Sequence, residues 1–162
     1  MIGGLTGRAT TPIIRIRMST AVDLPAGFVV EDHVGFLLRR AHQRHVALFT
    51  ARLAHADLTP TQFTALFKTV EKGRITQNHL GRLAAMDPAT IQGVVQRLIA
   101  RGLIRRSRDP MDRRTAVLEP TTEGRALIAE AIGCAQQSHD AALQPLSPQE
   151  RDQLLALLRK MG

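Results

Sequence analysis

The sequence predicts a mainly α-helical protein with one small β-hairpin, and three observations support this fold class. Apolar residues recur at three- and four-residue steps through most of the chain after residue 28, which is the spacing of an amphipathic helix. Five of these segments begin with a residue type that caps helices, and three of the caps are followed by Pro: Thr59, Thr76, Asp87, Thr121 and Ser147. Only residues 103–119 contain two short strand-like runs, which bracket the charged loop 109–114.

The composition favours one domain with an acidic partner. A chain of 162 residues with 44% hydrophobic content is normally a single globular domain, and a net charge of +8 favours nucleic acid or an anionic membrane surface. Seven arginines and two aspartates lie between residues 97 and 114, and arginine is the side chain that forks onto phosphate and guanine. Membrane-surface helices use Trp on their apolar face, and this chain has neither Trp nor Tyr. We therefore expect nucleic acid.

The single cysteine and the chain ends indicate a cytoplasmic protein. Cys134 cannot form an intramolecular disulfide, which fits a reducing compartment, and we expect it to be a small buried residue rather than a redox switch. No run of about 18 apolar residues predicts a membrane span. Residues 1–28 lack a secretory apolar region and are predicted to be a disordered extension, in which Met18 could be the true start. We expect a bacterial-type protein associated with the nucleoid.

The first part of the folded chain is predicted to contain two helices. Residues 29–56 carry no helix-ending Pro or Gly and are expected to form one long helix. At 1.5 Å per residue it would span about 40 Å, longer than a small domain needs, so we expect it to contact a second subunit. Thr59 and Gln62 form a capping box that opens a helix to about residue 71, and Gly73 ends it. Its expected buried face consists of Phe63, Leu66, Phe67 and Val70.

The middle of the chain predicts a helix-turn-helix followed by a wing. Ile75 is expected to be a one-residue strand that pairs with the hairpin, and a short helix then covers residues 77–85. A second helix begins at Asp87-Pro88, ends at Gly102, and has an apolar face made of Ile91, Val94, Val95 and Leu98. Its other face is short and polar, which suits a helix lying against base edges in a major groove. Two short helices joined by a tight turn form a helix-turn-helix.

The C-terminal segment predicts two further helices. Thr121 caps one that reaches about Leu143, and Ser147 with Glu150 forms a second capping box. The last helix has a narrow apolar stripe suited to dimerisation: Leu154, Leu157, Leu158 and Met161. The expected organisation is a winged helix-turn-helix lobe at 59–121, flanked by dimerisation helices at 29–58 and 122–162, all within one domain at 29–162.

These elements resemble the MarR family of winged helix-turn-helix transcription regulators over about residues 32–160. The wing carries the most specific match, an Asp-x-Arg, an apolar strand and a Thr-x-x-Gly: Asp112, Arg114, Val117, Leu118, Thr121 and Gly124. The resemblance implies that Arg114 enters the minor groove, that Asp112 orients it, and that Arg113 and Arg108 are neighbouring candidates. With the polar face of the second helix and the start of the first, the expected DNA-binding set is Thr76, Gln77, Pro88, Ala89, Thr90, Gln92, Gly93, Gln96, Arg97, Arg108, Asp112, Arg113 and Arg114.

Two residues depart from the family pattern. Pro120 stands where relatives have Leu, and we expect it to end the second wing strand early. Gly93 stands where many relatives have arginine, so one direct base contact should be missing. The segments TIQGVVQRL and LLRRAHQR are similar to the branch of the family that responds to aromatic acids or their thioesters, including hydroxynicotinate and coumarate regulators.

The resemblance implies a dimeric repressor that a small aromatic acid releases from a pseudo-palindromic operator. The expected effector cleft lies between the dimer helices and the DNA-binding lobe and is lined by Arg39, Arg40, His42, His45, Phe49, Phe63 and Phe67. Guanidinium groups suit a carboxylate, and phenylalanines suit an aromatic ring. No cofactor is expected. No enzyme is expected either, because the chain has no nucleophile elbow, Gly-rich phosphate loop or zinc-protease spacing.

Three alternatives remain open at this point. An architectural DNA-binding protein blind to effectors would show the same basic surface. A metal-sensing regulator could use His42 and His45, although two ligands leave a zinc site incomplete, and a redox-sensing regulator would need Cys134. A winged-helix enzyme would require a further catalytic domain, for which the expected elements leave no room.

Overall fold

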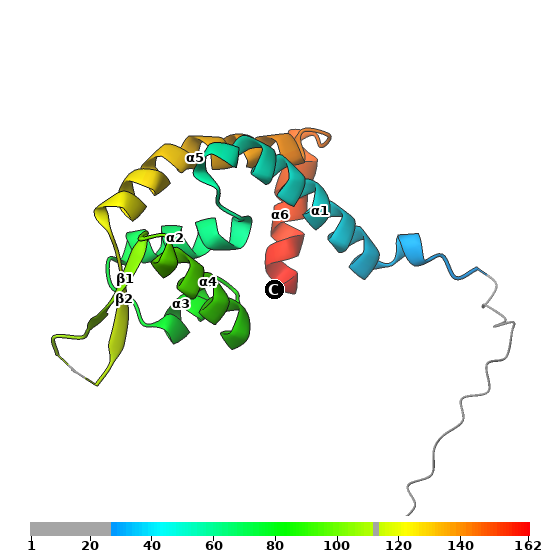
Figure 1. Cartoon of the computed structure of the whole chain (residues 1–162). Coiled ribbons are helices and arrows are strands. Elements are labelled where there is room, and N and C mark those ends of the chain that lie inside the picture. Colours follow the sequence, from blue (N-terminus) through cyan, green and yellow to red (C-terminus); the bar gives the residue numbers. More distant parts are fainter. Residues whose placement is uncertain (1–26, 112–113) are drawn as a thin grey trace, which may run out of the picture.

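The structure, a computed structural model, describes residues 27–111 and 114–162. The predicted disorder at 1–26 and the roles predicted for Asp112 and Arg113 lie outside this part of the chain. The elements in order are η1 (Val30–Asp32), α1 (Val34–Arg52), η2 (Ala54–Ala56), α2 (Pro60–Lys72), α3 (Gln77–Leu83), α4 (Pro88–Ala100), β1 (Ile104–Arg108), β2 (Ala116–Pro120), α5 (Thr122–Leu143) and α6 (Pro148–Met161). Figure 1 shows α1 running along α5 above a lobe of α2, α3 and α4, from which the hairpin projects. The predicted fold class is confirmed.

The expected single helix at 29–56 is wrong, because the chain breaks at both ends of α1. His33 is extended (φ −77°, ψ 138°) between η1 and α1, and its ring lies 4.5 Å from that of Phe28. Leu53 leaves the helical region (φ −105°, ψ 21°) and is only 1% exposed. The break at Leu53 inserts its side chain into the core and turns the chain toward α2. With 19 residues, α1 spans about 28 Å.

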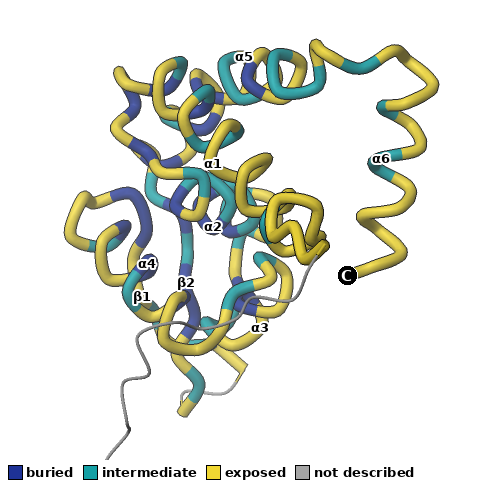
Figure 2. Tube along the Cα trace, turned by 90° about the vertical axis from the view of Figure 1, so that its right-hand side faces the viewer, coloured by how far each residue is buried: buried dark blue, intermediate teal, exposed yellow. Residues whose placement is uncertain are grey.

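The core is centred where α2, α4 and the hairpin meet, and it extends to Phe49 of α1 and Ile128 of α5. The predicted buried face of α4 is confirmed, since each of its four apolar residues is at most 3% exposed: Ile91, Val94, Val95 and Leu98. In Figure 2, buried residues are frequent inside the lobe, whereas α6 is mainly exposed and stands apart from the lobe.

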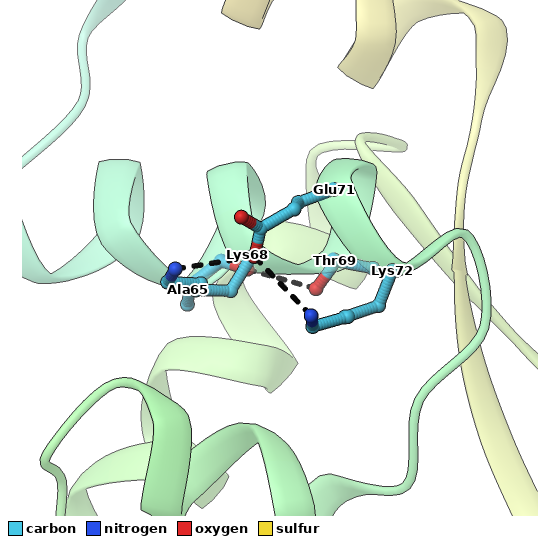
Figure 3. Close-up of polar contacts among 5 residues, drawn as sticks. All are labelled: Ala65, Lys68, Thr69, Glu71 and Lys72. Atoms are coloured by element: carbon cyan, nitrogen blue, oxygen red, sulfur yellow. Dashed lines mark hydrogen bonds and ion pairs between the residues drawn. The ribbon is translucent and has the colours of Figure 1, made fainter.

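The buried face of α2 is rotated about the helix axis relative to the predicted face. Its buried residues are Gln62, Ala65, Leu66 and Thr69, whereas Phe63, Phe67 and Val70 are half-buried. The Thr69 hydroxyl donates to the Ala65 carbonyl at 2.8 Å, which lets a polar side chain occupy the core. Figure 3 shows this bond together with the ion pairs from Glu71 to the two neighbouring lysines. The phenylalanines are thus left at the edge of the core, where Phe63 contacts Phe49 of α1.

Backbone hydrogen bonds of Ile75, in the α2–α3 connection, attach the hairpin to the lobe. β1 and β2 pair antiparallel from Ile104↔Pro120 to Arg108↔Ala116. The predicted one-residue strand is confirmed: Ile75 and Leu118 exchange N–H···O bonds of 3.1 and 2.8 Å. The expected early end of β2 at Pro120 is wrong, because Pro120 is itself the last paired residue. A proline is tolerated there since the end of an edge strand needs no further N–H donor.

The Thr-x-x-Gly motif joins the wing to α5. The Thr121 hydroxyl accepts from the Gly124 N–H at 3.0 Å and donates to the Gly102 carbonyl at 2.7 Å, and the Thr121 N–H donates to the Leu103 carbonyl at 3.1 Å. A Cβ at Gly124 would lie 2.0 Å from that carbonyl oxygen. Only glycine lets the first turn of α5 approach the wing so closely.

Candidate nucleic-acid interface and effector cavity

The outer face of α4 is polar and open to solvent. Most of its predicted DNA-reading residues are exposed: Pro88, Ala89, Thr90, Gln92, Gln96 and Arg97. Gly93 is half-buried, and a Cβ there would meet nothing within 4 Å. Because the opposite face fills the core, α4 can present only this polar stripe to a partner. The stripe contains short side chains and one arginine, so a groove floor can approach the helix closely.

Asp87 fixes the start of α4. Its carboxylate accepts from the Ala89 N–H at 3.0 Å, the Thr90 N–H at 2.9 Å and the Thr90 hydroxyl at 2.5 Å. The hydrogen bond from the Thr90 hydroxyl, followed by those from the backbone, lowers the pKa of Asp87. The ionised carboxylate therefore stabilises the first turn of the helix, and it holds the Thr90 hydroxyl against the cap.

The start of α3 is joined to the wing by side chains. Arg106 of β1 donates to the Gln77 side-chain oxygen at 2.8 Å, and the Thr76 hydroxyl accepts from the His79 N–H at 3.3 Å. The two residues at the start of α3 that belong to the predicted DNA-binding set thus have partners within the protein. Sequence reasoning left Arg106 out of the DNA-binding set, although its alternation with Arg105 along a strand places the two on opposite faces.

Not all the arginines of the basic cluster face the same way. Arg101, at the end of α4, donates to the Asp57 carbonyl at 2.5 Å and to the Ala56 carbonyl at 2.9 Å. It therefore binds the connection between α1 and α2 and has a structural role. Arg108 and Arg114 are exposed on the two sides of the wing tip, as a groove-entering element requires.

A cavity of about 340 Å³ lies between α1, α5 and α6. Its polar lining consists of His42, Arg44, His45 and His139, and leucines of α6 close its apolar side. Burial, followed by the proximity of His42 and His139, lowers the pKa of His45. Within residues 27–111 and 114–162, no three His, Cys, Asp or Glu side chains are grouped as a metal site.

The predicted effector residues fall into separate groups. His42 and His45 line the cavity, and the sequence analysis missed its Arg44 and His139, the latter because it lies on a distant helix. A row of rings leads from the cavity into the core: His45 to Phe49 (6.1 Å), Phe49 to Phe63 (5.5 Å) and Phe63 to Phe67 (6.1 Å). Arg39 and Arg40 do not line the cavity.

The two outlying arginines and the core phenylalanine have other surroundings. Arg39 lies over the ring of Phe36 at 5.1 Å, a cation–π contact on the outside of α1. Arg40 is exposed. Phe49 is 4% exposed and belongs to the hydrophobic core. The cavity therefore takes two imidazoles from α1 and a third, that of His139, from α5, and its arginine is a different one from those predicted.

Comparison with known proteins places these features in a family context. Residues 56–115 match the sequence model of the MarR family. The chain is 42% identical over 132 residues to the HTH-type transcriptional repressor NicR of Pseudomonas putida, covering 82% of this chain and 84% of NicR. No described helix is long and apolar enough to cross a membrane.

Two solved structures are similar to the whole described fold. A probable transcriptional regulator from Pseudomonas aeruginosa has a TM-score of 0.79 and 46% identity, covering 83% of this chain and 100% of that one. BpsR of Bordetella bronchiseptica, whose DNA binding is regulated by 6-hydroxynicotinic acid, has a TM-score of 0.78 and 40% identity, covering 83% of this chain and 96% of BpsR.

Proposed function

Because the chain belongs to the MarR family, we propose that it is a dimeric, sequence-specific DNA-binding repressor, and that a small aromatic acid releases it from a pseudo-palindromic operator. The observation that carries the proposal is the exposed polar face of α4 beside the arginine-bearing wing. Repression by NicR and the regulation of BpsR by 6-hydroxynicotinic acid support it. We propose a regulatory role without catalysis, exercised on the nucleoid.

In the proposed complex, α4 lies in the major groove and the wing in the adjacent minor groove. Thr90, Gln92 and Gln96 read base edges, and Arg97 contacts phosphate. The N–H groups at the start of α3 and the side chains of the wing tip add backbone contacts. In the minor groove, the guanidinium of Arg114 meets the strong negative potential of narrow A·T-rich segments.

The DNA-binding part is tested with an operator selected from random duplexes. We expect Arg114→Ala to weaken operator binding by at least about tenfold in a gel shift, whereas Arg159→Ala, an equal loss of charge at the end of α6, leaves it nearly unchanged. Equal affinity of the wild-type protein for selected and random duplexes would indicate an architectural DNA binder instead. Unchanged affinity of Arg114→Ala would contradict the minor-groove role.

Dimerisation is proposed to cover the apolar residues left exposed on α1 and α6. Leu37 is 49%, Leu157 60% and Met161 64% exposed, and a helix with such a stripe at the chain end needs a partner. A two-fold dimer would place its recognition helices about 34 Å apart, one turn of DNA. We expect Leu157→Glu to produce monomers in sedimentation, with Gln153→Glu on the same helix as the control. A dimer unaffected by Leu157→Glu would exclude α6 from the interface.

The effector is proposed to bind in the cavity between α1, α5 and α6. Its volume of about 340 Å³ is near the lower end of ligand pockets. The Arg44 guanidinium suits a carboxylate, and the leucines suit the faces of a ring. Imidazoles of His42, His45 and His139 can exchange hydrogen bonds with a ring hydroxyl or nitrogen. A hydroxylated aromatic acid such as 6-hydroxynicotinic acid presents all three features.

A titration with 6-hydroxynicotinic acid tests the effector and its site together. We expect the acid to weaken operator binding, and 2-hydroxypyridine, which lacks the carboxylate, to have little effect. Arg44→Met should abolish the response, whereas Arg40→Met, one turn earlier on α1, should retain it. If Arg40→Met abolishes the response and Arg44→Met does not, the acid binds outside this cavity, about one turn nearer the start of α1.

A further inference from the structure

Both strands of the wing are held by a side chain from outside the hairpin. Arg74 lies in the α2–α3 connection, directly after Gly73, whose φ of 70° turns the chain. Its Nε lies 2.9 Å from Oε1 of Glu119 on β2, and its Nη2 donates to the carbonyl of Arg108 on β1 at 3.1 Å. One guanidinium therefore bonds to both strands of the wing.

Glu119 is the other half of this arrangement. Its side chain is 14% exposed, and its Oε2 lies 2.8 Å from Nη2 of Arg105. The two guanidinium groups favour the ionised form of this carboxylate, because opposite charges lie next to it. Beside it, the mutual backbone hydrogen bonds of Ile75 and Leu118 attach β2 to the same connection. The contacts to Glu119 and Leu118 lie in the inner half of β2, and the contact to Arg108 lies at the outer end of β1, so the α2–α3 connection holds the hairpin along its length.

The angle of the wing matters because of its length. A two-stranded hairpin has little rigidity of its own in water, so its direction depends on its contacts with the lobe. A strand of 5 residues spans about 17 Å, and a tilt of about 10° at the base would therefore displace the tip by about 3 Å. That displacement equals a whole hydrogen-bond length, enough to remove a side chain at the tip from its contact.

We propose that Arg74 and Glu119 form a brace that sets the angle of the wing and thereby positions Arg114 in the minor groove. The proposal rests on the proposed DNA-binding function. It makes Arg74 a positioning residue rather than a DNA contact, although its side chain is 43% exposed and basic. A phosphate contact by Arg74 is the competing explanation, and the two differ in measurable ways.

The first experiment measures the brace without DNA. In the full-length protein, we expect Arg74→Ala and Glu119→Gln to accelerate amide hydrogen exchange at Leu118, which donates to Ile75, and at Asp109, which donates to Thr115 across the hairpin. Glu123→Gln, an equal change of charge on the exposed first turn of α5, should leave exchange unchanged. Unchanged exchange in both brace variants would overturn the proposal. This readout remains valid if the wild-type protein binds no operator, an outcome that would refute only the proposed function.

The second experiment is a double-mutant cycle on operator affinity. We expect Arg74→Ala to weaken binding by about tenfold, and to have almost no effect in the Arg114→Ala background, because the brace acts through that residue. Glu119→Gln should weaken binding relative to Glu123→Gln. An equal loss from Arg74→Ala in both backgrounds, with the salt slope reduced further by about 0.9 per arginine, would identify a phosphate contact. Tighter binding by Glu119→Gln than by Glu123→Gln would likewise overturn the brace.

Discussion

Replacing Gly124 with alanine tests how closely the wing and α5 must approach. The added Cβ would lie 2.0 Å from the Leu103 carbonyl oxygen and 3.3 Å from Cδ1 of Leu66. An ordinary C···O contact is about 3.3 Å or longer, so α5 and the Leu103 backbone would have to separate by roughly 1.3 Å. Neither side can move freely, since the obstacle is backbone and Leu66 is fully buried.

The same displacement would stretch the hydrogen bonds that Thr121 makes to the wing, which are 3.1 Å and 2.7 Å long. Overpacking costs about 1–3 kcal/mol, and loss of a helix cap costs about 1 kcal/mol more. We therefore expect Gly124→Ala to lower the free energy of unfolding by about 2–4 kcal/mol. That is a large fraction of the roughly 5–15 kcal/mol typical of a folded domain.

Urea unfolding followed by circular dichroism, at fixed protein concentration, measures this loss. Gly93→Ala is the matched control, because a Cβ there meets nothing within 4 Å and alanine in a helix is favoured by about 0.5–1 kcal/mol. We expect that control to be neutral or stabilising. A Gly124→Ala protein as stable as the wild type would show that α5 can move away from the wing at little cost.

Three further changes probe other features. Thr121→Val removes the cap of α5 and should lower the free energy of unfolding by about 1–2 kcal/mol in urea. An unchanged unfolding midpoint would show that the cap does not stabilise the protein. Because the pKa of His45 is lowered in the folded protein, the unfolded chain binds a proton at this histidine at a higher pH than the folded one does. The contribution of His45 to stability is therefore complete above its ordinary pKa of 6.5 and is lost as the pH falls below that value. Thermal unfolding of His45→Gln should accordingly decline less between pH 7.5 and pH 5.5 than that of the wild type, and parallel declines would refute this. Arg101→Met removes two hydrogen bonds to the α1–α2 connection and should cost about 1 kcal/mol, with Arg159→Met as the control expected to cost nothing.

Local signals explain why the starts and buried faces of several helices could be predicted from the sequence. Thr59 with Gln62 and Ser147 with Glu150 form the capping boxes expected of them, because a cap depends on residues within one turn. The buried stripe of α4 follows in the same way from periodicity. Pairing of Ile75 with the hairpin was also predictable, since an isolated apolar residue between two helices needs a buried partner.

The features that depend on tertiary packing could not be predicted from the sequence. No Gly or Pro marks the break at Leu53, which occurs because its side chain enters the core. The contact of Arg74 with Glu119 and that of Gln77 with Arg106 join residues far apart in the chain, and nothing local distinguishes these arginines from their exposed neighbours. His139 joins the cavity only because α5 runs beside α1.

The cap of α4 also restricts which bases Thr90 can recognise. The ionised Asp87 carboxylate can only accept hydrogen bonds, so the Thr90 hydroxyl donates its single hydrogen to it. What remains on the outer side of that oxygen is a lone pair. In the major groove, the edges of guanine and thymine offer acceptors to a hydroxyl, whereas the amino groups of adenine and cytosine donate. If Thr90 reads a base as proposed, the Asp87 carboxylate therefore gives this position of α4 a preference for exocyclic amines, although Asp87 itself touches no base.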